Sequence, residues 1–252
     1  MGGVRGEKNL VWTFQFLVLA LAFVFFLGLS RAFSFFPHPL KVLEAAGELF
    51  ASGEITPHLL VTLYETLAGL AISIVLGIWI GSVLGVSRAL AEIFEPMILA
   101  AYAVPKIIFL PLLLMIFGVG LDAKIANAAL HAIFPIIFNT AVGIREVNAI
   151  HVKLARSMNA GRGQIFRKVY FPSMVLPVFA GMRIGLGFCF LGSLLAELFE
   201  AKTGLGYLVT DFYNAGEIAR MLAVILFVFL LTMSINAGLK AVENRLSRWR
   251  AP

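Results

Sequence analysis

Long apolar runs alternate with short polar connections along this chain, and their lengths predict helices that cross a membrane. A helix needs about 20 predominantly apolar residues to span the hydrocarbon layer of a bilayer. Six segments meet this condition, namely Leu10–Leu29, Leu59–Val86, Ile93–Phe117, Ala123–Val142, Ser173–Leu198 and Met221–Leu239. We therefore predict an all-α membrane protein with six transmembrane helices, forming a single transmembrane domain over residues 1–252.

Two of the predicted spans carry local signals of their own. The first follows Arg5 and Lys8, as a signal peptide would, but its apolar run is longer than usual and no small-residue cleavage site follows, so we expect a retained helix. The third span is interrupted by prolines, at positions 96, 105 and 111. Between the first two spans, Lys41–Phe50 is expected to form a short surface helix.

Composition supports a polytopic membrane protein. Hydrophobic residues make up 60% of the chain and charged residues 13%, whereas soluble domains are about half apolar and a quarter charged. A chain of this size cannot bury so much apolar surface in one aqueous core. Cys189 is the single cysteine and has no disulfide partner in the chain, and the four histidines show no metal-ligand spacing, so no metal site is predicted.

The net charge of +6 is distributed unevenly among the connections. Thirteen Lys and Arg residues lie on the side that carries both termini and residues 145–172, and five lie on the other side. Because positive residues favour the cytoplasmic side, we predict a multi-pass protein of the plasma (inner) membrane with both termini in the cytoplasm. No basic run is interleaved with exposed aromatic residues, so nucleic-acid binding is not expected.

The segment at 145–172 is the most polar internal part of the chain and is far longer than a tight helix connection requires. Asn159 and Gly161 tolerate the left-handed conformation that ends a helix, and Pro172 is expected to begin the next span. The segment is therefore predicted to form two short helices joined by a sharp turn. An apolar edge of Val152, Ala155 and Met158 suits either the groove of a partner protein or lipid headgroups.

Motifs in this segment and in the neighbouring spans resemble those of one transporter family. Lys153-Leu154-Ala155, Asn159 and Val169–Pro172 fit the spacing of the Glu-Ala-Ala, Gly, Ile-x-Leu-Pro signature of binding-protein-dependent ABC importer permeases, with Lys in place of Glu and Asn in place of Gly. Further matching elements mark the nitrate, sulfonate, taurine and bicarbonate branch, and these are Val104–Leu112, Phe134–Thr140, Ala155–Ser157 and Thr203–Leu208.

The resemblance implies a type I ABC importer-like permease with a cytoplasmic coupling-helix loop at about 145–172. It implies a second copy of the chain, two cytoplasmic ABC ATPase subunits and an extracytoplasmic substrate-binding protein as partners, besides membrane lipid. Contacts with the ATPase are expected from Lys153, Ala155, Arg156, Asn159, Ala160 and Gly161.

The chain contains no phosphate-binding G-x-x-x-x-G-K-[ST] loop. It also shows no arrangement of a nucleophile with a base. We therefore expect a translocation subunit that is not itself an enzyme and holds no cofactor, with ATP and Mg bound by the partner ATPase.

Small residues recur every four positions in the second span, at Gly69, Ser73, Gly77, Gly81 and Gly85. Such a ladder lets two helix backbones approach closely in lipid. It is consistent with static packing or with a sliding contact near a pathway. Gly181 and Gly185 in the fifth span have the same meaning.

Polar or aromatic residues inside the spans are the candidates for a translocation path, because ionisable groups are costly in lipid. We name Glu65, Lys106, Asn139, Arg183 and Phe190. Two cations would favour a small anionic organic or oxyanion substrate, unless Glu65 or a backbone carbonyl neutralises them. His131 is expected to be a hydrogen-bonded packing residue, and Glu197 lies nearer the outer face.

An ion-gradient-driven secondary transporter or channel without an ATPase remains the alternative function. Intramembrane charges and proline-broken helices are common at transporter sites. The long basic cytoplasmic loop argues against it, because a gradient-driven carrier does not require such a loop.

Overall fold

The computed structural model describes residues 35–200 and 202–246, together with Leu17, Leu21 and residues 24–28 and 30–33, and these residues form helices and connections without strands. The predicted span Leu10–Leu29 lies largely outside the described residues. The helices are α2 (Pro39–Ala51), α3 (Ile55–Val86), α4 (Arg88–Ala103), the 3₁₀ helix η1 (Lys106–Phe109), α5 (Leu110–Phe117), α6 (Leu121–Arg145), α7 (Ala149–Ser157), α8 (Arg162–Ile165), the π-helical turn η2 (Phe166–Tyr170), α9 (Phe171–Glu200), α10 (Leu205–Asn214) and α11 (Ile218–Leu246).

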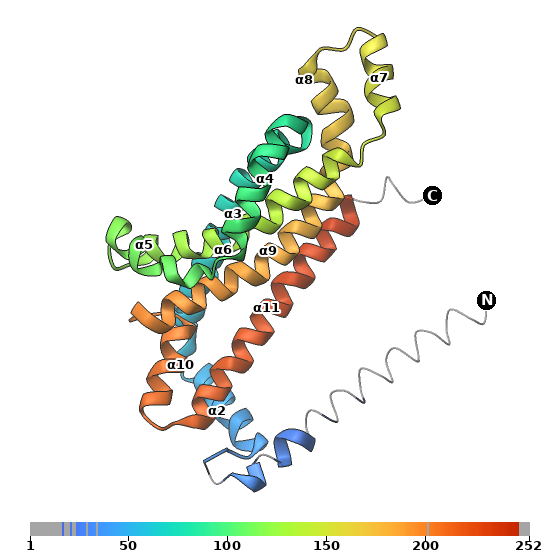
Figure 1. Cartoon of the computed structure of the whole chain (residues 1–252). Coiled ribbons are helices and arrows are strands. Elements are labelled where there is room, and N and C mark those ends of the chain that lie inside the picture. The colour runs from blue at the N-terminus through green and yellow to red at the C-terminus, as the bar shows by residue number, and fades with distance from the viewer. Residues whose placement is uncertain are drawn as a thin grey trace, which may run out of the picture.

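Among the described residues, four helices are long and apolar enough to cross a membrane, and they correspond to the predicted second, fourth, fifth and sixth spans. They are α3, α6, the continuous helix that ends in α9, and α11. Helix α6 packs along both α3 and α9, and α11 lies beside α9 (Figure 1). These three neighbouring helices, α3, α6 and α9, hold most of the packed interior.

The predicted third span is not one straight helix. Helix α4 and the segment Lys106–Phe117 meet at an angle of 88°. Pro105 lies at the break, where Val104 has extended backbone angles of φ −67° and ψ 132°. A proline disfavours the helical conformation of the residue before it, which explains why the helix ends here. Pro96, in contrast, is accommodated inside α4.

The prediction that Pro172 begins the fifth span is wrong. The helix runs without a break from Arg162 to Phe199, and Pro172 lies inside it. The π-helical turn η2 immediately precedes the proline, and the amide of Phe171 bonds to the carbonyl of Phe166, five residues back. This wider turn absorbs the misfit between the proline ring and the preceding backbone, so the helix continues.

The ladder of small residues on α3 is the contact surface for α6; the sequence predicts a close helix contact here but not the partner helix. A Cβ atom added to Gly81 would lie 2.5 Å from the carbonyl oxygen of Ile137, and one added to Gly77 would lie 2.7 Å from a methyl carbon of Ile136. The hydroxyl of Ser73 lies 2.9 Å from the carbonyl oxygen of Ala129 on α6. The backbones of α3 and α6 therefore approach so closely that no larger side chain fits between them.

Helix α9 approaches the opposite side of α6 with similarly close backbone contacts. A Cβ atom added to Gly181 of α9 would lie 2.9 Å from the carbonyl oxygen of Pro135, and one added to Gly185 would lie 3.1 Å from that of Ala132. Helix α6 is thus enclosed between two helices that both present small residues to it.

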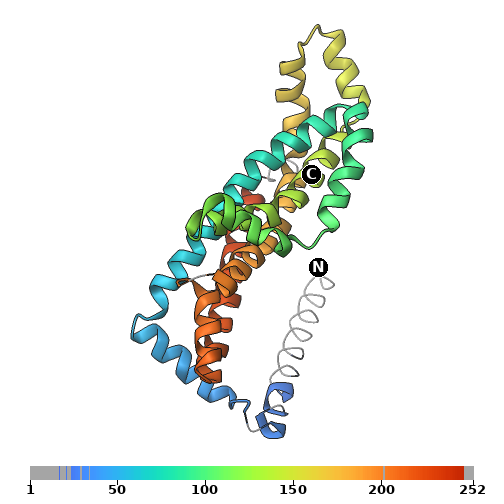
Figure 2. The same cartoon turned by 60° about the vertical axis from the view of Figure 1, so that its left-hand side comes forward.

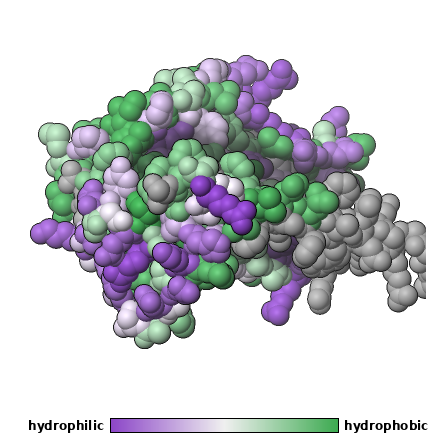
Figure 3. All heavy atoms as spheres, turned by 90° about the horizontal axis from the view of Figure 1, so that it is seen from below, coloured by the Kyte–Doolittle hydropathy of each residue, from purple (hydrophilic) through white to green (hydrophobic). Residues whose placement is uncertain are grey.

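The two ends of the bundle carry different structures (Figures 1 and 2). Helices α7 and α8 form a hairpin that projects from one end. At the other end, α2 and α10 pack with the ends of α3 and α11 around a separate apolar core, which includes Val42, Leu49, Leu205, Phe212 and Val224. The predicted surface helix Lys41–Phe50 is confirmed as α2. Hydrophilic side chains are prominent on this end of the molecule, among hydrophobic ones (Figure 3).

A Gly81→Leu substitution tests the close contact between α3 and α6. We expect it to destabilise the purified protein by at least about 1–3 kcal/mol, the usual cost of forcing extra atoms into a packed interior. Thermal unfolding in detergent measures the change. Gly238→Leu on α11 is the control, because a Cβ atom there meets nothing within 4 Å. Equal unfolding temperatures for the two variants would contradict the packing described here.

Candidate functional site

Local hydrogen bonds and turn conformations within residues 148–165 form the projecting hairpin. The side chain of Asn148 accepts a hydrogen bond of 2.9 Å from the amide of Ile150 and caps the start of α7. Helix α7 ends at Ser157, Asn159 in the turn that follows has φ +59°, and the amide of Ala160 bonds back to the carbonyl of Ala155 at 3.0 Å. The predicted turn at Asn159 is therefore confirmed. The second arm begins where the amide of Gly161 donates to the side chain of Gln164 at 2.9 Å.

The exposed apolar edge of α7 differs from the predicted one. Ile150, Leu154 and Met158 are 66%, 57% and 75% exposed, whereas Val152 and Ala155 are half-buried. The spacing i, i+4, i+8 places the three exposed side chains on one helix face. Met158 is the one residue of the predicted edge that belongs to this exposed face. The prediction did not include Ile150 and Leu154.

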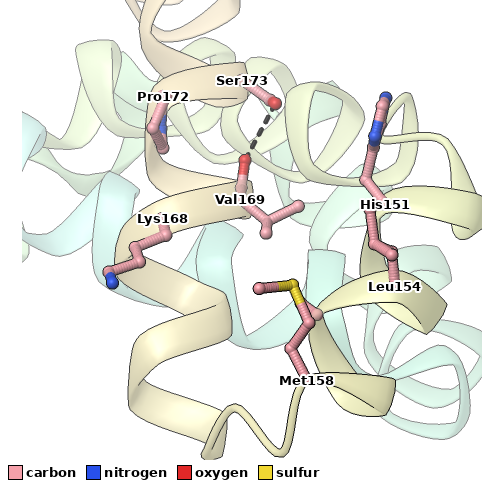
Figure 4. Close-up of a pocket in the computed structure, with 8 residues that line it drawn as sticks. His151, Leu154, Met158, Lys168, Val169, Pro172 and Ser173 are labelled. Carbon is pink, nitrogen blue, oxygen red and sulfur yellow. Dashed lines mark hydrogen bonds between the residues drawn. The ribbon is translucent and has the colours of Figure 1, made fainter.

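A groove of about 360 Å³ separates α7 from the facing arm of the hairpin (Figure 4). The lining of the groove is mostly apolar, with polar groups contributed by His151, Lys168 and Ser173. The residues that line it come from α7 and from the helix around Pro172, and they are His151, Leu154, Ala155, Met158, Lys168, Val169, Pro172 and Ser173.

The predicted coupling residues all lie on this hairpin. Ala155 lines the groove, and Ala160 is half-buried at the turn. Lys153 and Arg156 are exposed, and neither forms an ion pair with an acidic residue in the described part of the chain. The hairpin therefore offers a small apolar groove flanked by unpaired positive charge.

The candidate path residues, unlike the coupling residues, lie on several different helices. Glu65 on α3 is fully buried and forms an ion pair with Lys124 on α6, whose side chain is 7% exposed. Lys124 is one of the five positive residues that the charge count assigns to the outer side, and it lies in the first turn of α6, where it is buried. Since Lys124 balances Glu65, Glu65 does not neutralise Lys106 or Arg183.

Lys106 lies at the break after α4. Its ammonium group donates to the carbonyl of Tyr102 and lies 4.3 Å from the centre of the Tyr102 ring and 5.2 Å from that of Phe134. A backbone carbonyl thus partly compensates the charge, which is one of the two predicted arrangements. No carboxylate in the described residues pairs with this ammonium.

Arg183 on α9 forms an ion pair with Glu243 near the end of α11. The sequence does not predict this partner, because the predicted sixth span ends at Leu239, before Glu243. Helix α11 instead continues to Leu246 and brings the carboxylate alongside α9. The guanidinium charge is therefore compensated within the chain.

Asn139 and Phe190 complete the predicted path set. The Asn139 amide donates to the carbonyl of Pro135 in its own helix at 2.8 Å. Phe190 is only 3% exposed and packs in the core of the bundle. The structure thus leaves Lys106, Asn139 and Arg183 partly exposed and encloses Glu65 and Phe190. The expectation for His131 is confirmed, since its Nδ1 lies 2.8 Å from the carbonyl oxygen of Asn127.

Comparison with known proteins identifies the architecture. Residues 73–248 match the family of binding-protein-dependent transport system inner membrane components. The taurine transport system permease protein TauC of Escherichia coli K12 is 30% identical over 223 residues, which cover 85% of this chain and 80% of TauC. The aliphatic sulfonates transport permease protein SsuC of Bacillus subtilis 168, whose assignment is itself provisional, is 29% identical over 85% of this chain and 78% of SsuC.

Solved structures share the fold. A chain of the MetNI methionine ABC transporter in an inward-facing conformation superposes with a TM-score of 0.68 at 21% identity, covering 77% of this chain and 96% of that one. An amino acid ABC transporter matches with a TM-score of 0.64 at 16% identity, over 79% and 97% of the two chains. The resemblance to type I importer permeases is therefore confirmed, and these matches do not favour the gradient-driven carrier. The chain belongs to the family of binding-protein-dependent transport system inner membrane components and is a membrane-spanning permease subunit of an ABC importer.

Proposed function

We propose that two copies of this permease subunit carry a small anionic solute from an extracytoplasmic binding protein into the cytoplasm. The observation that carries the mechanism is the projecting hairpin, with its exposed apolar face and its groove beside Ala155. Relatives named for taurine, aliphatic sulfonates and nitrate support an organic acid, a sulfonate or an inorganic oxyanion as the solute.

Two cytoplasmic ATPase subunits supply the energy. They bind ATP and Mg, and this chain contributes no cofactor. Both termini and the hairpin lie in the cytoplasm, as the excess of Lys and Arg around residues 145–172 supports. Lys153, Arg156 and Asn159 are exposed on the hairpin and contact the ATPase. Ala155 provides the shallow part of the groove that receives an apolar side chain of that partner.

Motion of the hairpin reaches the membrane through both of its ends. One arm leads back to α6 within a few residues, and the other arm is continuous with α9. At the base of the hairpin, Arg145 pairs with Glu95 of α4 and donates to the carbonyl of Leu84 on α3 at 3.3 Å. A displacement of the hairpin therefore moves α6 and α9 and also pulls on α3 and α4.

The solute path is proposed to pass Lys106 and Asn139. Lys106 retains a positive charge without a carboxylate partner in the described residues, so it can attract an anion at the break between α4 and α5. Arg183 is compensated by Glu243 and contributes less. Glu65 and Phe190 lie in the packed interior, so a role in the path would require the helices to separate during transport.

Ala155→Glu tests the docking role of the hairpin. We expect at least a tenfold loss of the ATPase subunit that co-purifies with the permease, because the larger side chain would fill the groove beside Ala155 and exclude the apolar side chain of the partner. Thermal unfolding of the permease alone should be unchanged, since Ala155 lies outside the bundle.

Ala149→Glu is the matched control for this experiment. It introduces the same charge on α7, but Ala149 is exposed and does not line the groove. If Ala155→Glu retained full ATPase association and transport, the groove would not be a docking site. Uptake by the permease alone, driven by an ion gradient, would contradict the importer mechanism itself.

Lys106→Met tests the path. The variant keeps the length of the side chain and removes its charge, so we expect the KM for transport of an anion to rise at least tenfold. Transport of taurine, nitrate and a short alkanesulfonate into proteoliposomes containing the ATPase and the binding protein measures this. Lys240→Met, at an exposed position on α11, is the control. An unchanged KM for every transported anion would remove Lys106 from the path.

A further inference from the structure

The first turn of α10 has its backbone amides bound by side chains of other helices. Gly204 donates to Nδ1 of His58 at 3.1 Å, Leu205 donates to the hydroxyl oxygen of Thr62 at 2.8 Å, and Gly206 donates to a carboxylate oxygen of Glu197 at 2.8 Å. Free amides at a helix start are usually capped by a side chain next to them in the sequence. Here α3 and α9 supply the cap, because Gly204 has no side chain.

This capping cluster of His58, Thr62 and Glu197 is largely buried, and the carboxyl group of Glu197 also lies against that of Glu65 on α3. The Thr62 hydroxyl donates to the other carboxylate oxygen of Glu197 at 2.7 Å, and the two residues are 0% and 1% exposed. Buried polar groups with satisfied hydrogen bonds hold their neighbours in one geometry. The cluster therefore fixes α10 to α3 and α9 at the same time.

The glycines of the turn are required by this arrangement. Gly204 has φ +114°, and an added Cβ atom would overlap the carboxylate of Glu197. A Cβ atom on Gly206 would lie 2.7 Å from the Cβ atom of Glu197. The Gly-Leu-Gly sequence is thus explained by the space that Glu197 occupies.

Two further ionisable groups, Lys124 and Glu65, adjoin the site. Lys124 of α6 pairs with Glu65 and lies 3.5 Å from the carbonyl oxygen of Thr203, directly before the turn. All three of the closely packed helices therefore contribute polar side chains at the point where α10 is attached.

Helix α9 joins this cluster to the hairpin at the opposite end of the molecule. The continuous helix from Arg162 to Phe199 has 38 residues, which corresponds to about 57 Å at 1.5 Å per residue. Arg162 begins the second arm of the hairpin, and Glu197 lies in the last turn of α9 (Figure 1). One helix thus connects the hairpin, which is proposed to meet the ATPase in the cytoplasm, with the opposite end of the bundle, which then faces the extracytoplasmic side and the binding protein.

We propose that the capping cluster transmits the docking of the binding protein to the ATPase. Docking displaces the assembly of α2 and α10, the cluster passes the displacement to the end of α9, and α9 passes it to the hairpin. His58, Thr62 and Glu197 are positioning residues for stimulated ATP hydrolysis and do not touch the nucleotide. This inference rests on the proposed function, since it uses the same partners and the same orientation.

Thr62→Val is the decisive variant. It keeps the shape of the side chain but leaves the amide of Leu205 and one oxygen of Glu197 without their buried partner. In proteoliposomes with the ATPase and the binding protein, we expect basal ATP hydrolysis to be unchanged. The stimulation of hydrolysis by the loaded binding protein should fall at least about fivefold, the lower range of typical coupling between sites. Thr62→Ser retains the hydroxyl and should restore the stimulation.

Thr66→Val is the matched control. Thr66 lies one turn further along α3, and its hydroxyl donates to Ser193 of α9 at 3.2 Å, so the substitution removes a buried bond between the same helices without touching the turn. Stimulation should persist in this variant. If Thr62→Val reduces the yield of folded complex, Glu197→Gln provides the second test, with the same loss of stimulation expected.

Three results would overturn the inference. Stimulation in Thr62→Val equal to that in Thr66→Val would show that the capping bonds do not carry the signal. Loss of basal and stimulated hydrolysis in the same proportion would indicate a general structural role. Full stimulation in Glu197→Gln would exclude the carboxylate. Failure of the wild-type chain to bind an ATPase would instead contradict the proposed function, which separates the two claims.

Discussion

The close approach of α6 to α3 and α9 is the constraint on which the rest of the structure depends. Lipid provides no hydrophobic drive for two apolar helices to associate, so tight packing and interhelical hydrogen bonds must hold them together. Gly77 and Gly81 provide this packing on one side of α6, and Gly181 and Gly185 provide it on the other. Helices packed this closely move together. A displacement at one end of the bundle therefore also displaces the other end.

Because the bundle is rigid, the elements at its two ends are mechanically connected. The hairpin is an extension of α6 and α9, and the assembly of α2 and α10 is attached to the opposite ends of α3 and α9 by buried hydrogen bonds. A permease has to relate events on the two faces of the membrane without carrying out chemistry itself. The arrangement described here does so with one long helix, α9, and with polar contacts at each of its ends.

Much of this architecture follows from local features of the sequence. Apolar run length identified four of the spans, small residues every four positions identified the contact surface of α3, and Asn159 identified the turn of the hairpin. Other features depend on contacts between distant residues. The π-helical turn that accommodates Pro172, the Arg183–Glu243 ion pair and the binding of the Gly204–Gly206 amides by α3 and α9 have no local signature. The burial of Lys124 depends in the same way on its distant partner Glu65.

Hydrogen–deuterium exchange tests most directly whether the hairpin is the docking element for an ATPase. Exchange would be measured for the purified permease alone and for its complex with the ATPase subunits. If the hairpin docks on the ATPase, exchange in the complex should be slower for amides of residues 149–165 and unchanged for α2 at the opposite end. Equal exchange of the hairpin amides in the two preparations, with the ATPase bound, would contradict this docking.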